Sequence, residues 1–296
     1  MNHPATPSKT AGRLLVVAAA LLWSTSGLFV KSPIFADWPE QTRGAILAFW
    51  RASAAAAALL PLVRRPRWRP ALVPMTISFT VMCVLFLSAM ALTTAGNAIW
   101  LQCTAPWWVF LISAVALREP FVRADLLPLG LATVGVALIL ACEFQGQAMV
   151  GVLCGLASGV TYAVVVLCLR RLNAEDHVWL IALNQLVAAL TLLPWVATQG
   201  IWPTGTQLAA AAAFGVFQMG LPYVLLARGL QSVTSQEAVL LTLIEPVLVP
   251  VWVFLAWGEV PAWWTCVGAG LILVGLIVRY LVFEPARPPG DVDLPV

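Results

Sequence analysis

An internal repeat is the feature that most constrains this chain. When the sequence is shifted by 140 positions without a gap, eleven residues of the segment 94–135 fall on identical residues of 234–275. In the first copy these are Thr94, Ala98, Leu101, Pro106, Val109, Ala116, Glu119, Gly130, Leu131, Val134 and Gly135. A weaker match at an offset of 139 sets Gly12, Trp23 and Lys31 on Gly151, Tyr162 and Arg170. Many transporters use two copies of one apolar unit to build a central site with two gates.

The composition predicts a membrane protein. Hydrophobic residues make up 61% of the 296 residues and charged residues 10%, and the mean hydropathy is +0.92. A soluble domain of this length cannot bury so much apolar surface, so the lipid bilayer is the expected solvent. Apolar runs of roughly 18 to 24 residues predict ten helical spans. They are approximately 12–30, 43–63, 71–92, 95–117, 125–142, 149–170, 177–198, 204–228, 234–257 and 261–283.

Basic residues predict how these spans are oriented. With the N-terminus in the cytoplasm, 13 of the 16 Lys and Arg lie on the cytoplasmic side, and only Lys31 and Arg43 lie on the other. Because Lys and Arg concentrate in cytoplasmic loops, both termini are expected there. Five spans per repeat is an odd number, so the second repeat is predicted to be inverted relative to the first. Two inverted halves around a central cavity can exchange conformations, which is the basis of alternating access.

The predicted organisation is therefore an all-α membrane protein with four segments. They are a cytoplasmic tail over 1–11, a first five-helix repeat over 12–145, a second over 146–283, and a cytoplasmic tail over 284–296. A duplicated membrane scaffold without a transport role remains the alternative interpretation of the same pattern.

Several motifs together resemble the EamA-type transporters of the drug/metabolite transporter superfamily. They are the segment Ala20–Lys31 (ALLWSTSGLFVK), Arg51 in the second span, and a proline followed thirteen residues later by a glutamate and then by spaced glycines, present as Pro106/Glu119 and Pro246/Glu259. The resemblance covers residues 12–283. It implies a bacterial inner-membrane exporter of small metabolites. Overall the chain resembles the YddG-type amino-acid exporters, although no single residue is diagnostic of that branch.

Charges inside the predicted spans are costly in lipid and are therefore candidates for function. Arg51 and Glu245 lie at comparable depth, and Glu237 lies nearer the cytoplasm. Arg51 can tie helices together by pairing with an acid or with backbone carbonyls, or it can contact substrate. Glu245 can contact substrate or cycle a proton. Glu119 and Glu259 start equivalent loops on opposite sides, where each can cap the next helix or act as a gate.

Prolines, aromatic rings and uncharged polar groups complete the predicted site. Pro106 and Pro246 each remove one backbone hydrogen bond at matching positions, which bends the helix or frees a carbonyl beside a cavity. Aromatic faces beside amides and hydroxyls suit an amphipathic substrate with an apolar side chain. The predicted substrate-binding residues are Trp23, Asn97, Trp100, Thr104, Pro106, Tyr162, Gln218, Tyr223, Glu245 and Pro246, and the predicted structural or gating residues are Arg51, Glu119, Glu237 and Glu259.

The leading hypothesis is a transporter of neutral or zwitterionic metabolites; the resemblance implies export, with amino acids, aromatic ones included, as the favoured substrates. Carriers of phosphate compounds normally need several intramembrane Lys or Arg, and this chain offers chiefly Arg51. Export of other metabolites or drugs is the alternative within the superfamily. A membrane enzyme would need a catalytic constellation at one depth, and the sequence has none. No cofactor, metal or nucleic-acid partner is expected; the partners are the small-molecule substrate and the bilayer, and the protein is expected to be a monomer.

Overall fold

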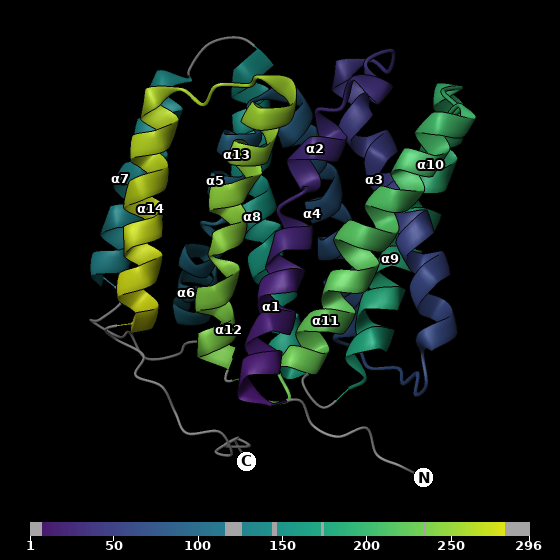
Figure 1. Ribbon diagram of the computed structural model, residues 1–296, viewed down its shortest axis with the longest axis horizontal. Helices are drawn as coiled ribbons and strands as arrows, with labels where there is room; N and C mark the ends of the chain where they lie inside the picture. Colours follow the sequence, from purple (N-terminus) through teal and green to yellow (C-terminus); the bar gives the residue numbers. More distant parts are fainter. Residues whose placement is uncertain (1–7, 116–125, 144–146, 173–174, 234, 282–296) are drawn as a thin grey trace.

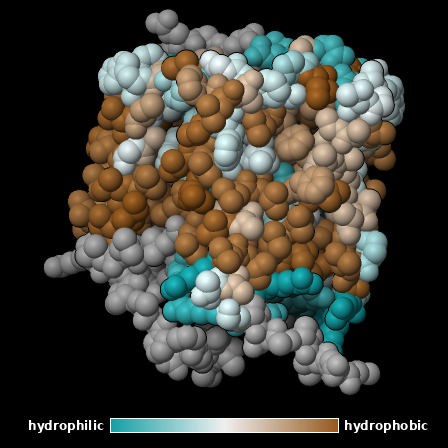
Figure 2. All heavy atoms as spheres, in the orientation of Figure 1, coloured by the Kyte–Doolittle hydropathy of each residue, from teal (hydrophilic) through white to brown (hydrophobic). Residues whose placement is uncertain are grey.

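The computed structural model describes residues 8–115, 126–143, 147–172, 175–233 and 235–281, and within them all regular structure is helical (Figure 1). The face in Figure 2 shows a broad apolar band between more polar ends. Six of the described helical segments are long and apolar enough to cross a membrane: Lys9–Val30, Glu40–Leu62, Leu72–Leu92, Ala148–Arg171, His177–Gln199 and Gly205–Gly229. Shorter apolar helices cover Leu129–Cys142, Ile244–Trp257 and Trp263–Val278. The chain is therefore a multi-pass membrane protein.

Helix occurs in every predicted span, but several spans are divided. The undivided helices are α3 (Glu40–Leu59, continued by the 3-10 turn η2, Leu60–Leu62), α4 (Leu72–Leu92), α7 (Leu126–Cys142), α8 (Gln147–Arg171), α9 (His177–Gln199) and α14 (Trp263–Leu281). The divided spans are α1 (Lys9–Trp23) with α2 (Ser26–Val30), α5 (Ala95–Gln102) with α6 (Ala105–Val115), α10 (Gly205–Ala213) with the π-helix η4 (Phe214–Gly220) and α11 (Leu221–Gly229), and α12 (Ser235–Thr242) with α13 (Ile244–Trp257). A short 3-10 helix, η1 (Pro33–Phe35), follows α2.

Two of the breaks occur at equivalent places in the two repeats. The α5–α6 break lies at Cys103 and Thr104, and the α12–α13 break lies at Leu243, which the shift of 140 sets on Cys103. The sequence predicts bends at the prolines themselves, whereas Pro106 and Pro246 lie within the first turn of α6 and α13. Proline is tolerated there because the N–H groups of a first turn have no partner in the helix. Each proline therefore begins a half-helix instead of kinking one.

Helix packing also follows the repeat. Helix α1 packs on α11 and α12, and its counterpart α8 packs on α4 and α5. The pairs α7–α14 and α3–α9 each join a helix to its own counterpart. In Figure 1, α12 and α13 run from the bottom of the bundle to the top, whereas α5 and α6 run from top to bottom. These packings are the ones that two repeats of opposite direction, related by a twofold axis, would produce.

Close helix contacts explain the equivalent glycines Gly12 and Gly151. A Cβ atom on Gly12 would lie 2.1 Å from the hydroxyl of Ser232 and 3.0 Å from the carbonyl oxygen of Gly229. A Cβ atom on Gly151 would lie 2.8 Å from the backbone nitrogen of Thr93. Glycine is required at both positions because any side chain would collide with a neighbouring helix end.

The remaining glycines of the Gly151, Gly155 and Gly159 run also face the interior of the bundle. A Cβ atom on Gly155 would meet the Leu101 side chain at 3.2 Å, and one on Gly159 would lie 3.0 Å from the Leu101 carbonyl. The run is therefore used for contacts within the protein, and it is not available as a face for a second copy.

Candidate functional site

Four of the predicted site residues meet where the break in α1–α2 faces the π-helix η4. Trp23 is the last residue of α1, and its ring packs edge-on against Tyr223 of α11, with 5.1 Å between the ring centroids. The side-chain nitrogen of Gln218, in η4, donates to the Trp23 carbonyl at 3.5 Å. Arg51 of α3 donates from Nη1 to Gln218 Oε1 at 3.2 Å. We call Trp23, Arg51, Gln218 and Tyr223 the central cluster.

Within this cluster Arg51 ties α3 to η4. Its side chain is only 2% exposed, and its guanidinium lies 5.1 Å from the ring centroid of Phe214. Gly215 allows this approach, because a Cβ atom there would lie 2.4 Å from the Arg51 carbonyl. The sequence left open whether Arg51 pairs with an acid, with backbone carbonyls or with substrate. The structure instead gives it an amide and an aromatic face, so a polar group from the other repeat stabilises the buried charge.

Removing one partner of this contact should destabilise the fold strongly. We expect Gln218→Leu to cost about 1.5–3 kcal/mol of unfolding free energy, because it removes a hydrogen bond to the buried Arg51 charge. The double variant Arg51→Met/Gln218→Leu should cost less than Gln218→Leu alone, since the charge is then gone as well. Thermal unfolding of the purified protein in detergent measures the difference, with Gln231→Leu, at an exposed position, as control. A double variant less stable than either single variant would contradict this account of Arg51.

Glu245 is a half-buried carboxylate at the start of α13, directly after the α12–α13 break. Among the described residues, none gives it a hydrogen bond or an ion pair, and Tyr223 and Cys103 lie near enough to sense its charge. Tyr162 of α8 lies near Tyr223. The position equivalent to Glu245 in the first repeat is Ala105. The acid is therefore a feature of one repeat only. It lies in the first turn of α13, where the helix dipole favours a negative charge.

Among the described residues, no hydrogen bond joins the other predicted residues of the α5–α6 span to the central cluster. The Thr104 hydroxyl donates to the Leu101 carbonyl at 2.6 Å and accepts a bond from the Trp108 indole at 3.2 Å. Trp100 is 5% exposed and belongs to the hydrophobic core. An apolar cavity of about 220 Å³ between α6, α7 and α8 is lined by Thr104, Trp107, Trp108, Ala132, Thr133, Val136, Ala137, Leu140 and Leu156. Pro106 lies next to this lining.

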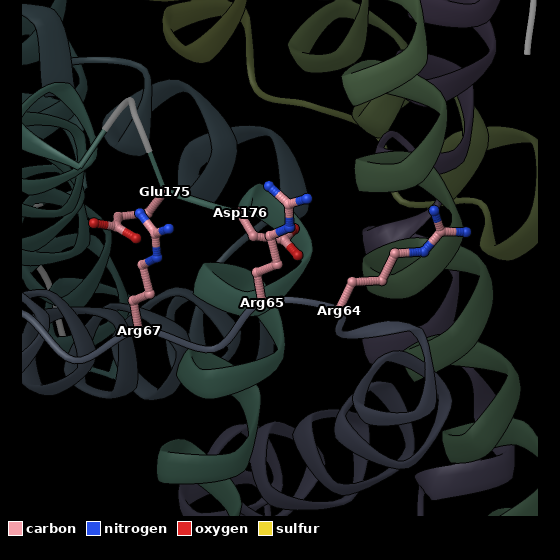
Figure 3. A pocket seen from close by; sticks show the side chains of 5 residues that line it. All are labelled: Arg64, Arg65, Arg67, Glu175 and Asp176. Carbon is pink, nitrogen blue, oxygen red and sulfur yellow. The ribbon is translucent and has the colours of Figure 1, made fainter. Parts of the chain in front are cut away.

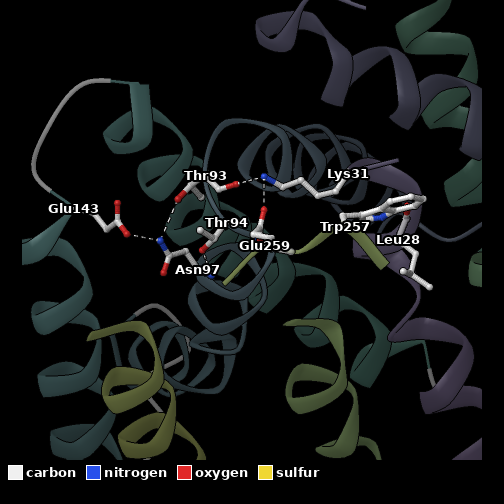
Figure 4. A network of polar contacts seen from close by, with 9 residues as sticks. Leu28, Lys31, Thr93, Thr94, Asn97, Glu143, Trp257 and Glu259 are labelled. Carbon is white, nitrogen blue, oxygen red and sulfur yellow. Dashed lines mark hydrogen bonds and ion pairs between the residues drawn. The ribbon is translucent and has the colours of Figure 1, made fainter. Parts of the chain in front are cut away.

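A polar network joins six helix ends at the end of the bundle where α2 stops, which we call the Lys31 end, and Figure 4 shows part of it. Lys31 Nζ donates to the Thr93 carbonyl at 2.6 Å and pairs with Glu259 Oε2 at 2.8 Å. The other carboxylate oxygen of Glu259 accepts a bond from the Ala95 backbone nitrogen at 2.7 Å. Glu259 does cap a helix, as the sequence suggested, but the helix is α5 of the other repeat and not the one that follows Glu259 in the chain.

Asn97 extends this network across the repeats. Its Nδ2 donates to the Thr93 hydroxyl at 3.0 Å and to Glu143 Oε1 at 2.9 Å, and its Oδ1 accepts from the Thr265 hydroxyl at 2.6 Å. The Trp264 indole also donates to Glu143, at 3.0 Å. The Lys31 network thus consists of Lys31, Thr93, Ala95, Asn97, Glu143, Glu259, Trp264 and Thr265. Of these, only Asn97 and Glu259 are residues that the sequence predicts for the site. The match of Lys31 to Arg170 at the offset of 139 is the sequence feature that points to the lysine.

At the opposite end, where α1 begins, Glu237 joins α12 to α1. Its carboxylate accepts a hydrogen bond from Arg13 and lies 3.9 Å from the Lys9 ammonium. Glu237 occupies the position equivalent to Asn97. Equivalent positions therefore carry polar ties between the repeats at both ends. Glu119, the counterpart of Glu259, lies outside the described residues.

Comparison with known proteins agrees with this architecture. The model of the EamA-like transporter family matches the chain twice, over residues 10–141 and 149–281. A protein of Archaeoglobus fulgidus named as an uncharacterized transporter is 26% identical over 273 residues, which cover 91% of this chain and 96% of that protein. One solved crystal structure superposes with a TM-score of 0.65 at 21% identity, covering 94% of this chain and the whole of that chain, and it shows the fold alone. Because the family model matches both halves and nearly the whole length, the chain belongs to the EamA-like transporter family.

Proposed function

We propose that the protein exports small neutral or zwitterionic metabolites, with aromatic amino acids as the preferred class, across the bacterial inner membrane by alternating access. The observation that carries the mechanism is the pair of breaks at Cys103–Thr104 and Leu243, at equivalent positions of two repeats that run in opposite directions. Discontinuous helices of this kind present half-helix ends inside the membrane, where they can bind a solute. Exchange of conformation between the repeats then opens the site to one side at a time.

In this proposal each divided span crosses the membrane once, which gives ten crossings with both termini in the cytoplasm. The distribution of basic residues supports that orientation. Exposed arginines cluster at the ends of α3, α8 and α11, on the same side as the start of α1, whereas Lys31 and Arg43 lie at the Lys31 end. An excess of Lys and Arg marks the cytoplasmic side, so the Lys31 end faces outward.

The central cluster and Glu245 favour a zwitterion with an apolar side chain. Glu245 offers a carboxylate without a protein partner among the described residues, which suits the ammonium group of an amino acid. Tyr223, which lies near Glu245, packs edge-on against Trp23, so an aromatic substrate ring has aromatic faces to stack on. Arg51 is buried against Gln218 and Phe214 and is therefore assigned to the scaffold.

Uptake into liposomes that contain the purified protein tests this proposal. Saturable uptake of phenylalanine, tryptophan or methionine is expected, and uptake should not occur in liposomes without protein. Trp23→Leu should raise the KM for phenylalanine by about three- to tenfold, because an aromatic contact contributes roughly 0.5–1.5 kcal/mol. Trp202→Leu, at a 59% exposed tryptophan, is the matched control and should leave the KM unchanged. Transport of nucleosides or polyamines with no amino acid would refute the substrate assignment.

A further inference from the structure

A second cavity lies at the end of the bundle where α1 begins, opposite the Lys31 end. It has a volume of about 400 Å³ and lies between the loop that joins α3 to α4 and the start of α9 (Figure 3). Among the described residues its lining consists of Arg64, Arg65, Arg67, Glu175 and Asp176. Cavities of this size accommodate small ligands.

The charges around this cavity favour an anion. Glu175 is buried, and its carboxylate is held by Arg69 at 2.7 Å. The Asp176 carboxylate accepts a bond from the Val178 backbone nitrogen at 3.0 Å, which caps α9. Both acids are thus engaged, and four guanidinium groups stand against two carboxylates.

Three of these guanidinium groups remain available. Arg64, Arg65 and Arg67 are exposed, and no hydrogen bond or ion pair ties their side chains to another described residue. Unengaged guanidinium groups bind phosphate oxygens by paired N–H bonds.

The loop that carries these arginines is held in place. The Trp179 indole donates to the Arg67 carbonyl at 2.9 Å, which fixes the loop to the start of α9. Pro66 and Pro70 restrict the backbone on either side of Arg67. The arginines therefore meet a ligand from a preorganised backbone, which lowers the entropic cost of binding.

Exposed apolar side chains lie in the loop that carries the arginines and in the helices on either side of it. Leu62, at the end of η2, is 52% exposed, and Trp68, within the loop, is 68% exposed. On α4, which follows the loop, Val73 and Ile77 are 44% and 58% exposed. A ligand with an anionic head and hydrocarbon chains matches this combination of arginines and exposed apolar side chains at the edge of the membrane.

We propose that this cavity binds the headgroup of an anionic phospholipid. Arg64, Arg65 and Arg67 contact the phosphodiester oxygens, and the acyl chains lie along the exposed apolar residues of η2 and α4. The inference depends on the membrane location of the chain and not on its transport substrate.

Native mass spectrometry of the purified protein with equimolar dioleoyl phosphatidylglycerol and dioleoyl phosphatidylcholine tests the site. The wild-type protein should retain the anionic lipid at least about tenfold more than the zwitterionic one, since each Arg near a membrane surface contributes roughly 1 kcal/mol. The triple variant Arg64→Gln/Arg65→Gln/Arg67→Gln should lose this preference. Arg170→Gln/Arg171→Gln/Arg228→Gln removes the same charge at exposed positions of the same side and should keep it.

Two results would overturn the proposal. Equal loss of preference in both triple variants would show that the lipid responds only to the net charge of this side. Displacement of the bound lipid by excess inorganic phosphate, with phosphate retained in its place, would show that the cavity is a site for a soluble anion. A thermal unfolding scan of each variant distinguishes loss of binding from loss of fold.

Discussion

Liposomes that contain the Glu245→Gln protein should lose the accumulation of amino acids driven by a pH gradient, and their uptake at low substrate concentration should fall by about 10- to 100-fold. The physical reason is that a hydrogen bond between charged groups contributes roughly 1.5–3 kcal/mol, and glutamine has no negative charge to pair with the ammonium group of the substrate. Glutamine also cannot release a proton. Exchange of labelled for unlabelled substrate needs no net proton movement, so measuring exchange by this variant separates substrate binding from proton transfer.

Glu245 is suited to this experiment because its side chain has no hydrogen bond or ion pair to another described residue. Replacing it orphans no such partner, so the fold should survive, unlike the fold of a variant at Gln218. Glu40→Gln, at an exposed acid that begins α3, is the control and should transport like the wild type. If neither the pH gradient nor Glu245→Gln affects transport, Glu245 neither carries a proton nor binds the substrate amine.

The fold was predictable from the sequence to the extent that lipid dictates it. A polar backbone must pair internally in a bilayer, so long apolar runs become helices, and helix occurs in all ten predicted ranges. The family match over 10–141 and 149–281 confirms the membership that the repeated proline, glutamate and glycines indicated. The positions of the helix breaks were harder to predict from the sequence, because a proline can mark the start of a helix as readily as a bend within one.

The sequence predicts which residues belong to the candidate site but not which of them contact one another. Polar and aromatic residues inside apolar runs are conspicuous, which is how Arg51, Gln218, Trp23 and Tyr223 were found. Their pairing was not predictable, because Arg51 and Gln218 are separated by 167 residues and lie in different repeats. The π-helix that places Gln218 over α3 has no periodicity that the sequence reveals, and Gly215 lets it approach the Arg51 backbone closely.

Most residues of the Lys31 network were not predicted from the sequence. Thr93, Glu143 and Thr265 lie at helix ends, where polar residues are ordinary, so nothing in their type singles them out. Glu259 was considered for capping or gating, and the structure shows a cap on the opposite repeat together with an ion pair to Lys31. A contact that joins the two repeats has to break if the repeats are to move apart at this end.

Glu259→Ala should therefore shift the protein toward a state that is open at the Lys31 end. The substitution removes the cap on Ala95, which contributes about 1 kcal/mol, and a partly exposed ion pair, which contributes about 0–1 kcal/mol. Together these change the populations of the two states by roughly 5- to 30-fold. The shift can be measured at the half-buried Cys103, which lies at the α5–α6 break. In a background where the other five cysteines are replaced by alanine, the rate at which a membrane-impermeant maleimide labels Cys103 should rise.

A series at Lys31 and Glu259 separates the two contacts. Glu259→Gln keeps an acceptor for the Ala95 N–H but loses the ion pair, so its labelling rate should lie between wild type and Glu259→Ala. The exchange Lys31→Glu/Glu259→Lys restores the pair without the cap, since lysine has no acceptor, and should be labelled more slowly than Lys31→Glu alone. Glu40→Ala, an exposed acid at the same end, should behave as wild type. If Glu259→Ala is labelled at the wild-type rate, the network fixes helix ends without controlling access, and the barrier at this end lies in the packing of α2 against α13.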